Sequence, residues 1–289
     1  MSTYGITGCS GYIGNHLRKL IENSNHTVIG LCRYPDHQLN DRYYDLTVPV
    51  DSKQLEGIHA IIHSAYDFSS YKTNTIQENV NYVGTRNLLA ACRKAKVDKF
   101  IYISSLASYS YALSNYGKVK YAIESLVLEF GGIVLRPGLV YGSKPKGAFL
   151  KLFKQVYSKK IIPVLGDGKY AQYLVHVDDL CKFTFLTTSS LFYDNSKDRL
   201  FSVANPKKWT FIDLIKEISS SSGRKPFIIH IPIGPIVGML KMVERIGFNI
   251  TYTSDNVISL CNPNAKIDFT SLYNTQQSFI SFNATIIKS

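Results

Sequence analysis

Apolar positions in the first 140 residues form two alternating patterns. Short apolar runs, typical of strands buried in a parallel sheet, occur at Thr3–Thr7, Val28–Leu31, Ala60–Ile62, Phe100–Ile103 and Ile133–Leu135. Between these runs, apolar residues recur at helical spacing over Asn15–Glu22 and Val80–Ala95. The alternation predicts right-handed βαβ units, and therefore an α/β fold with a Rossmann-type doubly wound parallel sheet.

The second half of the chain follows a looser pattern. Thr210 is a suitable N-cap for a helix over Phe211–Ser219, with Asp213 three residues further on. Another helix is expected from about Ile236, within the apolar stretch 228–246, and we expect it to be buried in a second domain. We therefore expect one domain over residues 1–142 and a smaller C-terminal α/β domain over 143–289, with some segments returning to the first domain.

Three glycines in the segment Thr7–Gly14 are spaced as GxxGxxG between the first predicted strand and the first predicted helix. Gly8 permits a tight turn, and Gly11 lets a pyrophosphate approach the backbone at the positive end of the helix. Gly14 lets the helix and the strand pack closely. This context predicts a dinucleotide site in residues 1–142, and residues 143–289 are interpreted as mostly substrate-binding.

The end of the second predicted strand bears on the choice of cofactor. An acidic residue there is typical of NAD binding, because a carboxylate binds the ribose 2′-hydroxyl. Here the strand ends in Leu31, Cys32 and Arg33, and the nearest acid, Asp36, lies beyond Pro35. Arg33 is suited to pair with the 2′-phosphate of NADP. We therefore expect NADP as the preferred cofactor, with NAD as the alternative.

Tyr116 and Lys120 are spaced four residues apart, so they share one face of a helix. A nearby ammonium group lowers the pKa of a tyrosine, which can then act as acid or base at a substrate carbonyl or hydroxyl. The same spacing occurs at Tyr193 and Lys197, but in a polar, turn-rich stretch without a preceding serine strand, and we reject that copy. Ser105, which follows a predicted strand, supplies a hydroxyl suited to bind a substrate oxygen.

Five further segments, in order along the chain, resemble the extended short-chain dehydrogenase/reductase family of nucleotide-sugar epimerases, dehydratases and reductases. They are Ile61–Ala65, the N-V-x-G-T-x-N-L-L helix pattern at Asn81–Leu89, the serine strand Tyr102–Tyr109, the L-R-P-x-x-V-Y-G pattern at Leu135–Gly142, and V-H-V-D-D-L at Val175–Leu180. The resemblance extends from Thr7 to about Leu180, with a weaker continuation to about Leu272.

The resemblance implies roles for individual residues. It implies that Ser105, Tyr116 and Lys120 are catalytic. The residues that it places at the cofactor are Gly8, Ser10, Gly11, Tyr12, Ile13, Gly14, Asp45, Leu46, Ala65, Tyr116, Lys120 and Pro137. Arg33 joins this set through the argument on NADP. His176 and Asp178 are interpreted as structural.

Three departures from the family pattern bear on the expected reaction and substrate. Leu106 and Ala107 replace the Asp-Glu pair that follows the active hydroxyl in dehydratases, which argues against dehydration. The short interval between Ser105 and Tyr116 indicates a trimmed substrate loop. Gln172 stands where many sugar-nucleotide enzymes carry an arginine that binds the diphosphate.

Basic residues are concentrated near the start of the expected substrate domain. The chain has 33 Lys and Arg against 21 Asp and Glu, a net charge of +12. Seven lysines and one acid lie between Lys144 and Lys169, without any arginine, which argues against a nucleic-acid groove. A solvated face, an anionic small molecule or an anionic membrane surface each fit this stretch. We expect these lysines to compensate for the missing arginine, so the predicted substrate-binding residues are Ser105, Tyr116, Lys146, Lys169 and Gln172.

Composition limits the class of protein and the kinds of site that are expected. With 289 residues, 45% of them hydrophobic, the chain is long and apolar enough for a folded core. No apolar run is long enough for a transmembrane helix, and no signal-peptide pattern opens the sequence. The five cysteines are odd in number and none are close in sequence, which argues against a disulfide framework or a zinc site and for a reducing, cytoplasmic location. We expect no metal.

Taken together, these features predict an NADP-dependent oxidoreductase, foremost a ketoreductase of a sugar or sugar nucleotide in polysaccharide biosynthesis. An NAD-dependent sugar-nucleotide epimerase is the first alternative. A non-catalytic dinucleotide sensor or assembly subunit is the second, although such proteins commonly lose the tyrosine or lysine of the Tyr116–Lys120 pair. The expected partner is a sugar-derived, anionic small molecule rather than a nucleic acid, and a homodimer is left open.

Overall fold

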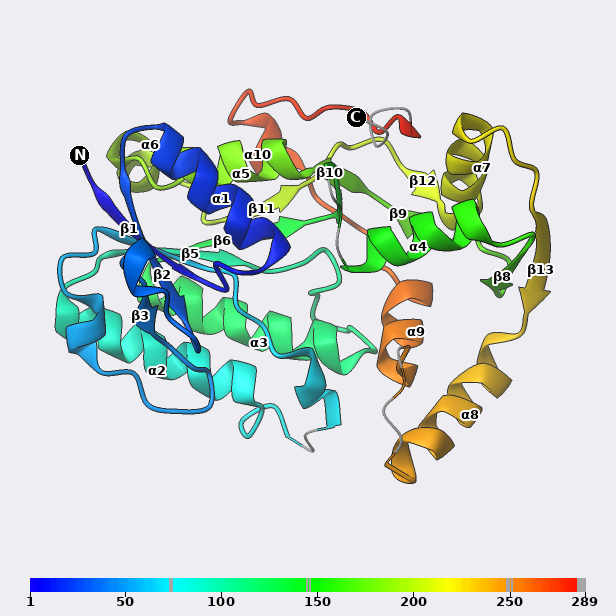
Figure 1. The fold of residues 1–289 in the computed structure, drawn as a ribbon, viewed down its shortest axis with the longest axis horizontal. Coiled ribbons are helices and arrows are strands. Elements are labelled where there is room, and N and C mark those ends of the chain that lie inside the picture. The colour runs from blue at the N-terminus through cyan, green and yellow to red at the C-terminus, as the bar shows by residue number, and fades with distance from the viewer. Residues whose placement is uncertain (73–74, 144, 146, 248–249, 251, 285–289) are drawn as a thin grey trace.

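A seven-stranded sheet in the order β11-β6-β5-β4-β1-β2-β3 crosses the molecule, and all of its neighbouring strands are parallel (Figure 1). The computed structural model describes residues 1–72, 75–143, 145, 147–247, 250 and 252–284. The strands of the sheet are β1 (Thr3–Thr7), β2 (Thr27–Cys32), β3 (Arg42–Tyr43), β4 (Ala60–His63), β5 (Lys99–Ile103), β6 (Ile133–Pro137) and β11 (Leu200–Val203). This arrangement confirms the predicted α/β, Rossmann-type fold.

Helices cover both faces of the sheet, as the doubly wound prediction requires (Figure 1). One face packs against α1 (Tyr12–Asn23), α5 (Val177–Leu186), α6 (Ser190–Asn195) and α10 (Thr270–Tyr273). The other face packs against α2 (Val80–Ala95) and α3 (Asn115–Phe130). Each face has its own hydrophobic core, because strands of a parallel sheet are apolar on both sides.

The apolar runs along the sequence identify five of the seven strands. The two that they miss are β3 and β11. β3 has only two residues, which is too short to show a pattern. β11 lies far along the chain, in its less regular half, yet it pairs with β6 at the edge of the sheet. Three short 3-10 helices, also absent from the pattern, lie at His37–Leu39, Ser52–Leu55 and Phe68–Lys72.

A second, smaller region with its own hydrophobic core is built mostly from residues after 138. It contains β7 (Leu139–Tyr141), β8 (Ile161–Leu165), β9 (Ala171–Gln172), β10 (Leu174–His176), β12 (Trp209–Thr210), β13 (Phe227–Ile231), α4 (Gly147–Ser158), α7 (Phe211–Ser221), α8 (Ile233–Arg245) and α9 (Ser254–Cys261). These strands pair two by two, β7 with β10, β8 with β13 and β9 with β12. The predicted capping of α7 is confirmed, since Thr210 and Asp213 form a reciprocal capping box. The domain division at residue 142 stays a prediction.

The prediction for the helix near Ile236 is wrong in one respect. The helix, α8, begins at Ile233, directly after Pro232, but none of its residues is buried. Met239 and Met242 are 53% and 65% exposed. The helix packs along α9 at one end of the molecule instead of entering a core (Figure 1). Among the described residues, no helix is long and apolar enough to cross a membrane.

Candidate active site

The glycine segment joins β1 to α1 and lies against the loop that follows β4. Gly8 has a φ of +68°, a conformation that residues with side chains rarely adopt. A Cβ at Gly8 would lie 2.9 Å from the amide nitrogen of Ala65, and one at Gly14 would overlap the Gly8 carbonyl oxygen. The tight turn and the close packing of helix on strand therefore both require glycine.

The start of α1 presents free backbone donors at this turn. Its N-cap is Gly11, no side chain caps it, and its first turn contains no acidic residue. Ser10 and Gly11 are exposed. The hydroxyl of Tyr12 donates to the carbonyl oxygen of Ser143 at 3.1 Å, which ties this helix start to the chain after β7. The first amides of a helix, together with its dipole, form an anion-binding site suited to a pyrophosphate.

The other residues that the resemblance places at the cofactor lie near the carboxyl ends of the strands or at the start of α1. They are Ile13 in α1, Asp45 and Leu46 after β3, Ala65 after β4, and Pro137 at the end of β6. Asp45 shapes its own turn, because one carboxylate oxygen accepts from both the amide and the hydroxyl of Thr47 at 2.8 Å. The fold thus brings distant segments to one edge, where α/β proteins bind ligands.

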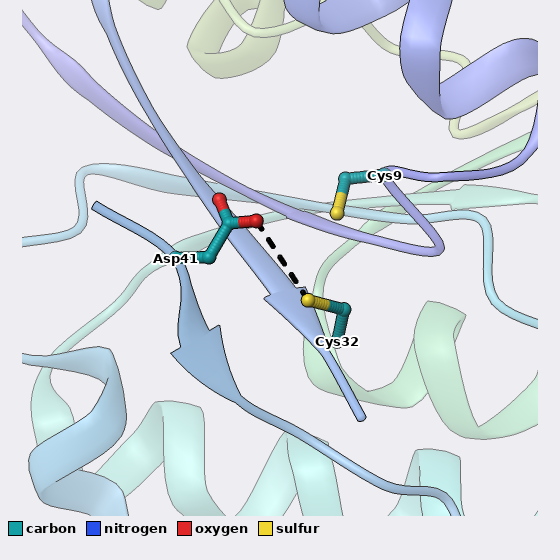
Figure 2. Close-up of side chains that lie close together, drawn as sticks. All are labelled: Cys9, Cys32 and Asp41. Atoms are coloured by element: carbon teal, nitrogen blue, oxygen red, sulfur yellow. Dashed lines mark hydrogen bonds between the residues drawn. The ribbon is translucent and has the colours of Figure 1, made fainter. Parts of the chain in front are cut away.

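An acidic residue does lie at the end of β2, but it comes from further along the chain. Asp41 forms an ion pair with Arg18 and accepts from the amide of Gly30 at 3.1 Å. The Sγ atom of Cys32 lies 3.8 Å from its other oxygen (Figure 2). This carboxylate is therefore engaged with protein groups, whereas Arg33 is exposed just beyond β2. No local pattern in the sequence indicates this position of Asp41.

The three predicted catalytic residues lie together. Tyr116 and Lys120 are one turn apart on α3, and the Lys120 Nζ atom lies 6.0 Å from the centre of the Tyr116 ring. Nζ donates to the carbonyl oxygen of Ile103, at the end of β5, at 2.8 Å. Ser105, two residues beyond β5, hydrogen-bonds to the Tyr116 side chain and accepts from the amide of Ala107 at 3.2 Å.

The protonation states differ from the sequence-based expectation. Burial raises the pKa of Tyr116, and the hydrogen bond with Ser105 offsets only part of this effect. Burial also lowers the pKa of Lys120 to about 7, against the attraction of Glu124. The expected lowering of the Tyr116 pKa by Lys120 is therefore wrong for this structure. The amine is only partly charged near neutral pH, and it points to the Ile103 carbonyl.

Aromatic side chains from the loop after β4 pack against these residues, and the sequence analysis missed them. The ring of Tyr66 meets that of Tyr116 edge-on, with centroids 5.2 Å apart, and Phe68 stacks on Tyr116 at 6.0 Å. The Lys120 Nζ atom lies 4.7 Å from the ring centre of Tyr66 and 4.6 Å from that of Tyr102. These cation–π contacts stabilise the charged amine where water is excluded. The sequence did contain a signal for them, because Tyr66 and Phe68 closely follow the Ile61–Ala65 motif.

A buried ion pair between Glu124 and Arg136 connects α3 to the sheet. Glu124 is 2% exposed, and its carboxylate accepts from Nε of Arg136 at 2.9 Å, from Nη2 of Arg136, and from the hydroxyl of Ser104. These bonds join α3 to β6 and to the end of β5. Glu124 lies four residues after Lys120, so its place on the same helix face could have been read from the sequence.

The N-terminus of α3 is bound by a residue 139 positions away. Asp255, buried in α9, accepts from the amide of Asn115 at 2.6 Å and from the amide of Tyr116 at 3.0 Å. A carboxylate at this end of a helix is favoured by the helix dipole. Burial raises the pKa of Asp255, although the two amide bonds oppose the shift. No sequence signal links two segments so far apart.

The predicted substrate-binding side is described in part. Gln172 is half-buried in β9 and lies opposite Trp209 of β12. Lys169 is exposed, and Lys146 lies outside the described residues. Lys207, which was not predicted, places its Nζ atom 4.2 Å from the centre of the Trp209 ring. The Lys207 side chain therefore lies beside the β9–β12 strand pair, which contains Gln172.

The histidine of the V-H-V-D-D-L motif has a local structural task. His176 is the N-cap of α5, and its Nδ1 atom accepts from the amide of Asp178 at 3.3 Å. The same atom lies 3.6 Å from the carboxylate of Asp178. The ring also packs edge-on against Tyr141, with centroids 5.1 Å apart. These contacts give His176 and Asp178 a structural role at the start of α5.

Comparison with known proteins shows which family and which individual proteins the chain is similar to. A sequence profile of the NAD dependent epimerase/dehydratase family matches residues 5–192. A putative UDP-glucose 4-epimerase of Methanocaldococcus jannaschii is 25% identical, over 75% of this chain and 82% of its own length. A ceramide reductase of Caulobacter vibrioides is 28% identical, over 78% of this chain and 73% of its own length.

Among solved structures, MoeE5 in complex with UDP-glucose and NAD superposes with a TM-score of 0.68 at 20% identity. The superposition covers 90% of this chain and 97% of MoeE5. At this level of identity, the likeness establishes the shared fold.

Proposed function

The chain belongs to the NAD dependent epimerase/dehydratase family, and from this premise we propose that it is a 4-epimerase acting on a sugar joined to a nucleoside diphosphate. The reaction inverts one carbon by oxidising its hydroxyl to a ketone and reducing the ketone on the opposite face. The observation that carries this proposal is the group Ser105, Tyr116 and Lys120, which lies at the same edge of the sheet as the glycine segment. The putative UDP-glucose 4-epimerase among the relatives supports the choice of reaction.

The edge of the sheet fits a dinucleotide. Gly8 and Gly14 leave no room for side chains where the backbone turns, and the uncapped start of α1 offers amides to a pyrophosphate. When bound there, the dinucleotide would supply hydride chemistry, taking a hydride from the sugar carbon and returning it. We propose that residues 1–142 hold this cofactor and that residues 143–289 supply most of the substrate contacts.

Tyr116 would move the proton that accompanies each hydride transfer. In the oxidation half-reaction, its phenolate oxygen accepts the proton of the sugar hydroxyl. In the reduction half-reaction, it returns that proton to the ketone oxygen, so the overall reaction consumes no reductant. Ser105 bonds to Tyr116 and is placed to hold the reacting oxygen. Lys120 would regain its full charge beside an anionic phenolate, because opposite charges favour each other's ionised forms.

The reductase that the sequence favours is the competing proposal, and the ceramide reductase relative agrees with it. The two differ in redox balance. An epimerase converts UDP-glucose to UDP-galactose with no net change in dinucleotide absorbance, whereas a reductase consumes one reduced dinucleotide for each product molecule. We expect chromatography to show interconversion of the two UDP-sugars at constant absorbance. Product formed only with stoichiometric NADH or NADPH consumption would establish the reductase instead.

The role of Tyr116 is tested in the same assay. Tyr116→Phe should lower turnover by about 100-fold or more, the usual range for general acid–base catalysis, while dinucleotide affinity changes little. Tyr121→Phe is the matched control, because Tyr121 is on the same helix and 39% exposed. Turnover of the Tyr116→Phe protein within about tenfold of the parent would exclude Tyr116 as the acid–base group.

A further inference from the structure

Two thiols and a carboxylate converge beside the glycine segment (Figure 2). Cys9 belongs to that segment, Cys32 ends β2, and Asp41 directly precedes β3. Their sulfur and oxygen ligand atoms all lie within 4.8 Å of one another, and Figure 2 shows the three side chains pointing toward one another. The cysteines are distant in sequence, which is why their spacing argued against a metal.

We propose that Cys9, Cys32 and Asp41 bind one zinc ion, with water as the fourth ligand. Zinc binds thiolate sulfur at about 2.3 Å and carboxylate oxygen at about 2.0–2.2 Å in tetrahedral geometry. These lengths separate the two sulfurs by about 3.8 Å, and sulfur from oxygen by about 3.5 Å. The observed Cys32 Sγ to Asp41 Oδ2 distance is 3.8 Å. Small side-chain rotations therefore complete the geometry.

The groups around these three residues already orient the carboxylate. Oδ1 of Asp41 is bound by Arg18 and by the amide of Gly30, which leaves Oδ2 on the side of Cys32. Metal ligands are commonly fixed by such outer hydrogen bonds. Gly30 also leaves space for the cluster, since a Cβ there would lie 2.7 Å from the Cys9 sulfur. Cys32 is half-buried, so its open side gives access to an ion and to water.

Arg18 supplies independent support for an anionic cluster. Its side chain is 8% exposed, and its Nη1 atom has no hydrogen-bond partner among the described residues. A thiolate at Cys9 would give this buried cation a second anionic neighbour. Zinc binding releases the two thiol protons. The charges of two thiolates, one carboxylate, Arg18 and Zn²⁺ then sum to zero, which lowers the cost of burying them.

The position of Cys9 links this site to the cofactor, and this step rests on the proposed dinucleotide site. Cys9 follows Gly8, so a bound zinc would fix the turn that has to receive the pyrophosphate. We therefore infer that zinc changes the affinity for the dinucleotide and that the dinucleotide changes the affinity for zinc by the same factor.

Cobalt is the probe for the site, because Co²⁺ with thiolate ligands in tetrahedral geometry absorbs strongly in visible light. We expect the reduced parent protein to bind one equivalent of Co²⁺ with this spectrum, and one equivalent of Zn²⁺ to abolish it. Cys32→Ser should weaken binding by about 100-fold or more, beyond the usual effect of losing an outer-sphere partner. Cys261→Ser, at a half-buried cysteine in α9, should bind as the parent does.

Two results would overturn the site. One is a parent protein without the thiolate spectrum, and the other is a spectrum that persists in Cys32→Ser. Circular dichroism confirms that each variant is folded, and Cys9→Ser repeats the test at the second thiol. NADH fluorescence titrations with and without Zn²⁺ test the coupling between zinc and dinucleotide, and an unchanged NADH affinity would overturn it. Because the cobalt spectrum needs no turnover, failure of the epimerase proposal leaves this test intact.

Discussion

Replacing Glu124 by glutamine removes the buried negative charge on α3, four residues after Lys120, while keeping the size of the side chain. The carboxylate is 2% exposed, and Arg136, its partner, has a side chain that is 16% exposed. Removing one partner of a buried ion pair costs about 3–5 kcal/mol. Because water reaches part of Arg136, we expect a loss of about 2–4 kcal/mol in the free energy of unfolding.

The matched control is Glu129→Gln, since Glu129 is exposed on the same helix. It should change the free energy of unfolding by less than about 0.5 kcal/mol. Urea titrations followed by circular dichroism measure both variants. A loss of 2–4 kcal/mol corresponds to a fall in melting temperature of at least about 3 °C for a chain of this size. Equal stability of the two variants would show that the Glu124–Arg136 pair does not stabilise the fold as described.

The same substitution should alter the chemistry through Lys120. Glu124 attracts the Lys120 ammonium and raises its pKa, against the larger effect of burial. Without this attraction, the pKa of Lys120 should fall below about 7. A smaller fraction of the amine should then be charged at neutral pH. If Tyr116 needs that charge, the alkaline limb of the kcat/KM profile moves to lower pH in Glu124→Gln. If the alkaline limb stays at the same pH in Glu124→Gln, Glu124 does not act on catalysis through Lys120 and its role is structural.

Four further predictions address single contacts. Arg33→Ala should weaken NADPH binding by about 1.5–3 kcal/mol, the size of a charged hydrogen bond, and leave NADH binding nearly unchanged; equal losses in fluorescence titrations would remove Arg33 from the 2′-phosphate. If exposed lysines attract the diphosphate, KM should rise with salt and again in Lys169→Ala, whereas a KM indifferent to both would return Lys169 to a solvated face. Asp255→Ala should lower kcat more than it changes dinucleotide affinity, because two amides at the start of α3 lose their carboxylate acceptor. An unchanged kcat in steady-state kinetics would contradict this role. The pKa of Lys120 is about 7 in the folded protein, below its ordinary 10.5, so the unfolded chain holds this proton more tightly. The free energy of unfolding should therefore rise between these two pH values, by up to about 1.4 kcal/mol per pH unit. Urea titrations of Lys120→Met should lack that rise.

The sequence by itself predicts the parts of this protein that depend on neighbours along the chain. The apolar runs of β1, β4 and β5 and the three glycines around the start of α1 predict the Rossmann-type fold, because strand burial and the turn are local requirements. The four-residue interval between Tyr116 and Lys120 likewise follows from helix periodicity. The order of the family motifs adds Ser105, which the fold brings beside Tyr116.

The tertiary structure decides everything that depends on distant segments. Asp255 reaches the start of α3, and Asp41 joins Cys9 and Cys32, only because separate loops fold against one another. The same holds for burial, since the apolar pattern of α8 is that of a core helix although no core covers it. The lowered pKa of Lys120 is a further case, because spacing reveals which side chains are neighbours but not how much water they lose.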